Sequence, residues 1–216
     1  MMLDPQLYAL FLTAALVLTL TPGPDTLFVL GASLGGGIRG GLFASGGILT
    51  GLLVHVGLAV AGVSMLIAAS PVAFDVLRLI GGGYLVWIGA SMLREARRYG
   101  GETTTGTSTP ARSSARLYWQ GAATNLFNPK VAVFYVAFLP QFVAPELGRL
   151  PLQLLLLGLT HWLMGLPYLV SVAAASGAMT AWLRRSPRVR RWLDIASGLL
   201  FIGLAVRLLT ARRASA

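Results

Sequence analysis

Residues 12–32 read LTAALVLTLTPGPDTLFVLGA, an apolar run that TPGPD interrupts at positions 21–25. Pro22 and Pro24 have no backbone N–H, so carbonyl groups in the preceding turn lose their helical partners. In hydrocarbon, such carbonyl groups are tolerated only where protein or a water-filled cavity meets them. This stretch therefore predicts a membrane-spanning helix that breaks at Thr21–Asp25, beside a cavity.

Six apolar stretches are readable along the chain of 216 residues. Each is near or beyond the roughly 20 residues that a helix needs to cross a bilayer. Their approximate bounds are 5–32, 41–69, 72–93, 117–143, 150–183 and 192–209. Only 11% of the residues are charged, whereas soluble domains have about 25%. We therefore expect an all-α, polytopic membrane protein in which six transmembrane helices form one domain in the lipid bilayer.

The second half of the chain repeats features of the first. Asn128-Pro129-Lys130 interrupts the fourth stretch much as Pro22 interrupts the first. The spacing between His55, in the second stretch, and His161, in the fifth, is nearly the same as the spacing between Pro22 and Pro129. An Ile-Gly pair recurs at 88–89 and 202–203, in the third and sixth stretches.

A repeat of three spans contains an odd number of crossings, so its two copies must be inverted in the membrane. Inverted repeats with broken helices are typical of secondary transporters. We expect residues 1–98 and 116–216 to form two inverted three-helix repeats, with proline breaks in the first and fourth helices. Residues 99–115 are rich in Thr, Ser and Gly, and we expect a flexible cytoplasmic loop there.

The net charge is +10, from 17 basic and 7 acidic residues. The basic residues fall in short runs between apolar stretches, which is typical of cytoplasmic loops and argues against a nucleic-acid partner. The arginines that we assign to the cytoplasmic side are Arg39, Arg94, Arg97, Arg98, Arg112, Arg116, Arg184, Arg185, Arg188, Arg190 and Arg191. With six spans, both termini are then outside.

Two side chains of opposite charge, Asp25 and Lys130, follow the two proline breaks. An ionisable residue within a span is a functional candidate, because its burial is costly. Half-helix N-termini near Asp25 and Asn128 can offer N–H groups to a substrate carboxylate, and Asp25 can take an amino group or a coupling proton. The alternatives are that Asp25 or Thr21 caps a half-helix and that Lys130 extends toward the membrane surface.

Two further sets of residues have a packing interpretation. His55 and His161 can relay protons, since histidine titrates near neutrality, but we favour polar packing contacts inside the bundle. The glycine pairs Gly37/Gly41 and Gly47/Gly51 let helices approach closely. Such pairs are compatible with a homodimer and do not require one.

Several chemistries find no support. The chain has no cysteine, which excludes disulfides and thiolate metal sites. No nucleophile–base pair and no cluster of metal-binding carboxylates is evident. We expect neither an enzyme, nor a metal site, nor a cofactor.

The motifs together resemble the LysE/RhtB family of amino-acid exporters over nearly the whole chain. The resemblance rests on Thr21–Asp25, Asn128–Lys130, Gly51–His55 (GLLVH) and Gly83–Gly89 (GYLVWIG). It implies a bacterial inner-membrane exporter of amino acids or derivatives, such as homoserine, threonine or homoserine lactones, driven by proton antiport. The alternatives are an exporter of small cations or metals and a membrane scaffold that transports nothing.

The residues expected to form the pathway for substrate and proton are Thr21, Asp25, His55, Asn125, Asn128, Lys130 and His161. The residues expected to break the helices are Pro22, Gly23, Pro24 and Pro129.

Overall fold

The computed structural model describes residues 3–63 and 113–176, with isolated positions between 79 and 94 and between 191 and 206. Every regular element in these ranges is a helix, and no strand occurs among them. The predicted third and sixth spans, and most of the predicted loop at 99–115, lie outside the described residues. Within the described part, Pro24–Gly62 and Leu150–Ala174 are long and apolar enough to cross a membrane.

The first two helices are separated by the TPGPD segment. Helix α1 spans Pro5–Leu20, and the Asp4 side chain caps it by accepting a hydrogen bond from the Leu7 N–H at 2.8 Å. Helix α2 spans Pro24–Leu58, with Pro24 at its first position and Gly23 as its cap residue. The helices stop and restart here because proline fits the first turn of a helix and not its interior.

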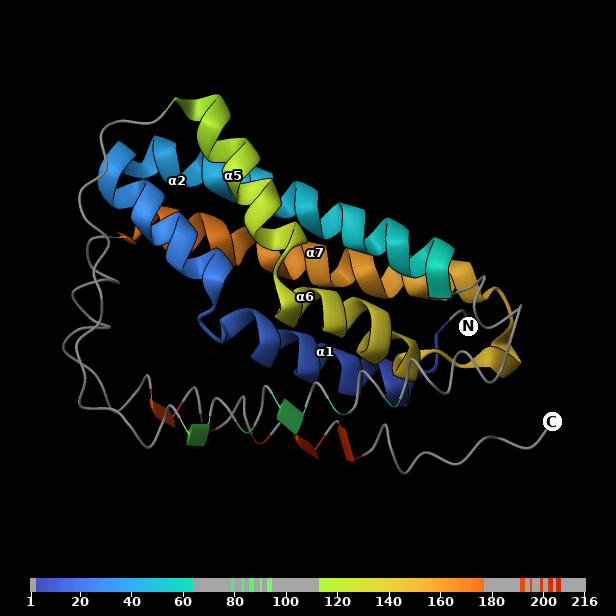
Figure 1. Ribbon diagram of the computed structural model, residues 1–216. Coiled ribbons are helices and arrows are strands. Elements are labelled where there is room, and N and C mark those ends of the chain that lie inside the picture. Colours follow the sequence, from blue (N-terminus) through green and yellow to red (C-terminus); the bar gives the residue numbers. More distant parts are fainter. Residues whose placement is uncertain are drawn as a thin grey trace.

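Helix α2 is bent into two arms. At Gly37 the backbone adopts φ 64° and ψ −170°, which a residue with a side chain rarely accepts. The first arm, residues 24–36, continues from α1, and the second, residues 38–58, returns across the bundle and ends in the π-helix η1, Ala59–Val63. Figure 1 shows the two arms in blue and cyan.

The second half opens with α5, Ser114–Leu126, which the Ser113 side chain caps. After the break at Phe127 and Asn128, the chain continues as α6 (Pro129–Val133), the π-helix η2 (Phe134–Phe138) and the 3-10 helix η3 (Leu139–Phe142). A short 3-10 helix, η4 (Pro145–Leu147), leads into α7 (Leu150–Ala174). In Figure 1, α5 and α6 run opposite to α1 and the first arm of α2.

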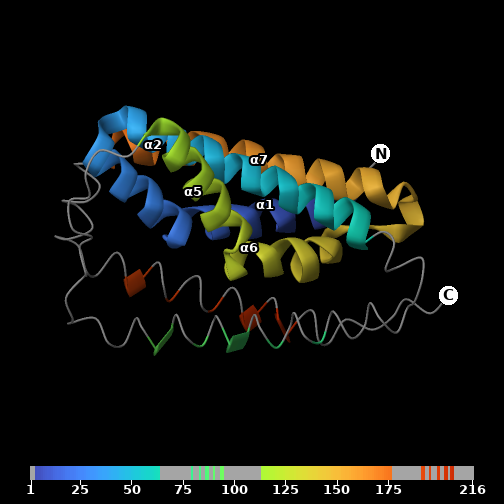
Figure 2. The ribbon, with the colours of Figure 1, turned by 45° about the horizontal axis from the view of Figure 1, so that its top comes forward.

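Small residues let the helices pack closely. Helix α2 lies against both α5 and α7, as Figures 1 and 2 show. A Cβ on Gly47 would overlap the Tyr118 carbonyl oxygen and lie 2.8 Å from the Ala122 nitrogen, and a Cβ on Gly121 would overlap the Ala44 carbonyl oxygen. The packing role that the sequence suggests for Gly47 therefore agrees with the structure.

We predict that Gly47→Ala lowers the stability of the purified protein by about 1–3 kcal/mol, the usual cost of overpacking. The added methyl group would meet the backbone of α5, which cannot move aside as a side chain can. Gly57→Ala is the matched control, because none of the residues that the structure describes lies within 4 Å of a Cβ there. Thermal unfolding in detergent measures the effect, and equal melting temperatures for the two variants would contradict it.

Candidate functional site

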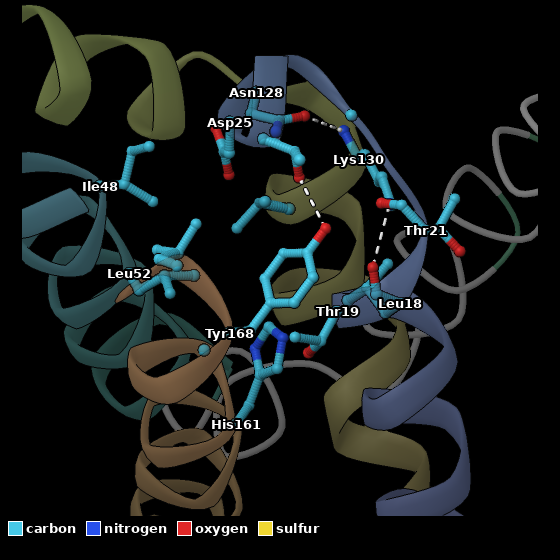
Figure 3. A pocket seen from close by; sticks show the side chains of 15 residues that line it. Leu18, Thr19, Thr21, Asp25, Ile48, Leu52, Asn128, Lys130, His161 and Tyr168 are labelled. Carbon is cyan, nitrogen blue, oxygen red and sulfur yellow. Dashed lines mark hydrogen bonds between the residues drawn. The ribbon is translucent and has the colours of Figure 1, made fainter. Parts of the chain in front are cut away.

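The two breaks lie beside one another and border a cavity of about 60 Å³. Its lining comes from α1, α2, α6 and α7 and from the break between α1 and α2. The lining residues are Leu18, Thr19, Thr21, Gly23, Asp25, Thr26, Ile48, Leu52, Asn128, Lys130, Val131, His161, Gly165, Tyr168 and Leu169. The close view in Figure 3 shows Asp25, Asn128 and Lys130 together on one side of this space.

Lys130 reaches across to the end of α1. Its Nζ donates hydrogen bonds to the backbone carbonyls of Leu18, at 3.1 Å, and Thr21, at 3.0 Å. In an uninterrupted helix the Leu18 carbonyl would accept from the N–H of residue 22, but that residue is proline. The ammonium group therefore replaces the missing donor, and a cation at the carbonyl end of a helix is also favoured by the helix dipole.

Asp25 makes the converse contact with the second half. Its Oδ2 accepts a hydrogen bond of 2.7 Å from Nδ2 of Asn125, in the last turn of α5. Its Oδ1 is buried and has no hydrogen-bond partner among the described residues. The alternative that Asp25 or Thr21 caps α2 is wrong, because the cap residue is Gly23, without a side-chain cap bond.

The two charged residues occupy equivalent positions in the two halves. Proline is the first residue of both α2 and α6, and Asp25 and Lys130 are the second residues. Each side chain bonds the last turn of the helix that precedes the other break, and Lys130 also bonds Thr21, just past the end of α1. Asn128 caps α6, because its side-chain oxygen accepts a hydrogen bond from the Lys130 N–H at 3.1 Å.

Both histidines make polar contacts inside the bundle. Nε2 of His55 lies 3.3 Å from the Asn125 carbonyl oxygen, so His55 borders the Asp25–Asn125 contact. Nδ1 of His161 lies 3.0 Å from the Tyr135 hydroxyl, and the Tyr135 ring stacks on His55 with centroids 5.7 Å apart. His161 also lines the cavity, whereas His55 does not.

The structure thus brings most of the predicted residues to one place. Thr21, Gly23, Asp25, Asn128, Lys130 and His161 line the cavity. Asn125 donates a hydrogen bond to Asp25, and His55 contacts the carbonyl oxygen of Asn125. Pro22, Pro24 and Pro129 lie at the breaks themselves.

Sequence reasoning missed several residues of the lining. The Tyr168 hydroxyl lies 3.1 Å from Thr26 Oγ1, which joins α7 to the start of α2. Ile48, Leu52 and Gly165 also face the cavity. The only sequence feature that marks the neighbourhood of Tyr168 is the adjacent Pro167. Ile48, Leu52 and Gly165 lie in apolar stretches, where the sequence does not distinguish a residue that lines a cavity from one that does not.

Broken helices that place opposite charges beside a cavity define a class, the membrane transport proteins. A family model described as "LysE type translocator" matches residues 16–212. The chain therefore belongs to the LysE type translocator family, whose members are integral membrane transport proteins of the bacterial inner membrane.

Curated relatives agree over nearly their whole length. A leucine efflux protein of Salmonella choleraesuis (strain SC-B67) is 32% identical over 94% of both chains. A leucine efflux protein of Enterobacter sp. (strain 638) is 32% identical over 92% of both. A homoserine/homoserine lactone efflux protein of Salmonella typhimurium is 32% identical over 96% of this chain and 97% of its own. No solved structure matches the chain.

We predict that Lys130→Met lowers the free energy of unfolding by about 1–3 kcal/mol, because hydrogen bonds to charged groups contribute about that much. Methionine keeps the apolar stem and leaves the Leu18 carbonyl without its donor. Lys130→Arg keeps the charge and should recover part of the loss. Arg116→Gln removes an exposed charge as the control. Unfolding in detergent measures the effect. Equal stability of Lys130→Met and Arg116→Gln would show that the hydrogen bonds from Lys130 to the end of α1 do not stabilise the fold.

Proposed function

We propose that this protein is a secondary transporter that exports amino acids or their derivatives from the bacterial cytoplasm in exchange for protons. The observation that carries the proposal is the pair of charged residues, Asp25 and Lys130, that follow the two helix breaks and line one cavity. The names of the relatives, leucine and homoserine or homoserine lactone efflux proteins, support this substrate class.

An amino acid carries both charges that such a site can recognise. Oδ1 of Asp25, which has no hydrogen-bond partner within the described part of the chain, is an acceptor for the substrate ammonium group. Lys130 is the donor for the carboxylate, because it carries a positive charge and lines the same cavity. In the absence of substrate, Asp25 is also the group that takes the coupling proton, since its Oδ1 is buried and accepts no hydrogen bond from the described residues.

The cavity accommodates only part of an amino acid in this conformation. A group the size of a water molecule needs roughly 10–15 Å³ of cavity volume. A cavity of about 60 Å³ therefore holds only a few groups of that size. Substrate entry therefore requires the walls to separate. We propose six spans in two inverted repeats, with proline-broken first and fourth helices, that rock about this site.

The charge distribution supports one orientation. Arg39 follows the bend of α2 and Arg116 lies in the first turn of α5, and Figure 1 shows both places at the same end of the bundle. Arg149, at the start of α7, lies at the opposite end. We propose that the arginine-rich end faces the cytoplasm and that both termini are outside. A homodimer is compatible with this arrangement.

The scaffold alternative needs helix breaks that are packed without a cavity. The cavity bordered by Thr21, Asp25 and Lys130 favours a transporter instead. The alternative of an exporter of small cations is tested in the efflux assay described below, in which a divalent cation is one of the substrates.

We predict that Asp25→Asn lowers proton-driven amino-acid efflux at least tenfold while the protein stays folded. The variant retains an oxygen that can accept from Asn125 and loses only the charge and the titration. Glu146→Gln is the matched control, because Glu146 is exposed on η4. Efflux of labelled leucine, homoserine and a divalent cation from proteoliposomes, with and without a proton gradient, is the measurement.

Three results are informative. Wild-type activity in both Asp25→Asn and Lys130→Met would refute the proposed site. Amino-acid efflux that ignores the proton gradient would refute antiport alone. Efflux of the cation without any amino acid would favour the cation exporter.

A further inference from the structure

The cavity has two chemically different walls. The charged and hydrogen-bonding groups, Asp25, Asn128 and Lys130, lie together, and Figure 3 places Ile48 and Leu52 away from Lys130, on the other side of the space. The apolar wall, defined as Ile48, Leu52, Gly165 and Leu169, belongs to α2 and α7. A zwitterionic head group fits the polar wall, so the apolar wall is left for the remainder of the substrate.

The apolar wall is built from two facing helix stripes. Ile48 and Leu52 are four residues apart on α2, and Gly165 and Leu169 are four residues apart on α7, so each pair lies on one helix face. The three side chains are almost fully buried, with 1%, 5% and 4% of their surface exposed for Ile48, Leu52 and Leu169. No hydrogen-bonding side chain belongs to this wall.

Gly165 has room for a methyl group. A Cβ at this position would lie 3.5 Å from Cδ1 of Leu52 and 3.9 Å from Cδ2 of Leu49, which are ordinary van der Waals distances. The glycine is therefore not required by close helix packing, unlike Gly158 on the same helix, whose Cβ would lie 2.9 Å from both methyl groups of Val56. The missing side chain at Gly165 therefore leaves space in the cavity wall.

We propose that the apolar wall receives an aliphatic substrate side chain and that Gly165 determines how large this side chain can be. The inference rests on the proposed export of amino acids and adds the preferred side chain and a residue that determines it. The curated relatives named for leucine and for homoserine are both 32% identical to this chain, so identity does not choose between them. The apolar wall favours an aliphatic side chain, because its four residues have no side-chain group that can bond a hydroxyl. The Thr26 and Tyr168 hydroxyls, which also line the cavity, already bond each other at 3.1 Å.

The expected size of the effect follows from the chemistry of apolar pockets. One methylene group in such a pocket changes selectivity by roughly 10- to 200-fold. Adding a methyl group at Gly165 removes about that much space. Gly165→Ala should therefore disfavour leucine relative to alanine by about tenfold or more.

The experiment compares wild type, Gly165→Ala and the control Gly57→Ala in proteoliposomes, with leucine, alanine and homoserine as substrates. We expect the wild type to prefer leucine to homoserine, Gly165→Ala to lower the leucine-to-alanine ratio by about tenfold or more, and Gly57→Ala to match the wild type. Leu52→Ala opens the same wall and should admit phenylalanine. The shift in melting temperature that each amino acid produces in detergent gives a second readout that needs no turnover.

The outcomes separate this inference from the proposed function. If homoserine is exported and leucine is not, the apolar wall does not receive the side chain, while amino-acid export stands. If a folded Gly165→Ala loses leucine and alanine equally, or neither, Gly165 does not determine size. If no amino acid is exported or bound by the wild type, the proposed function itself fails.

Discussion

The contact between the Lys130 ammonium group and the end of α1 is the interaction on which the site depends. Pro22 deprives the Leu18 carbonyl of its helical donor, and a bare carbonyl away from water is costly. Lys130 has the opposite problem, because its half-buried ammonium group needs acceptors. Its bonds to Leu18 and Thr21, at 3.1 and 3.0 Å, satisfy both needs at once. A broken helix and an intramembrane charge are each unfavourable alone and tolerable together.

The same solution appears in reverse in the other half of the chain. Asp25 follows the first break and accepts from Asn125, at the end of the helix that precedes the second. The two halves are therefore joined by crossed polar contacts, to which the Thr26–Tyr168 and His55–Asn125 contacts add others. Any motion that separates the halves must exchange these contacts for others. In the proposed transport cycle, a substrate with one positive and one negative group supplies the replacements.

The rest of the bundle keeps these groups in place. Close packing of α2 against α5 depends on Gly47 and Gly121, where a side chain would overlap backbone of the facing helix. The bend at Gly37 returns the second arm of α2 along the bundle, so that Ile48 and Leu52 reach the cavity that Asp25 borders. An aromatic cluster joins the segment that follows α6 to α1: the ring centroids of Phe138 and Phe142 are 4.7 Å apart, and those of Phe11 and Phe142 are 5.5 Å apart.

The sequence alone determined the features that arise from local chemistry. Proline lacks an N–H wherever it stands, so the breaks at Pro22, Pro24 and Pro129, and the Asn128 cap, could be predicted without knowing any neighbour. Only the tertiary structure decided which groups meet: Lys130 with the Leu18 carbonyl, Asp25 with Asn125 instead of its own helix end, and Gly165 with Leu52. The reason is that these contacts join residues far apart in the chain, and in an apolar span the pattern of residues does not reveal which face of a helix points inward.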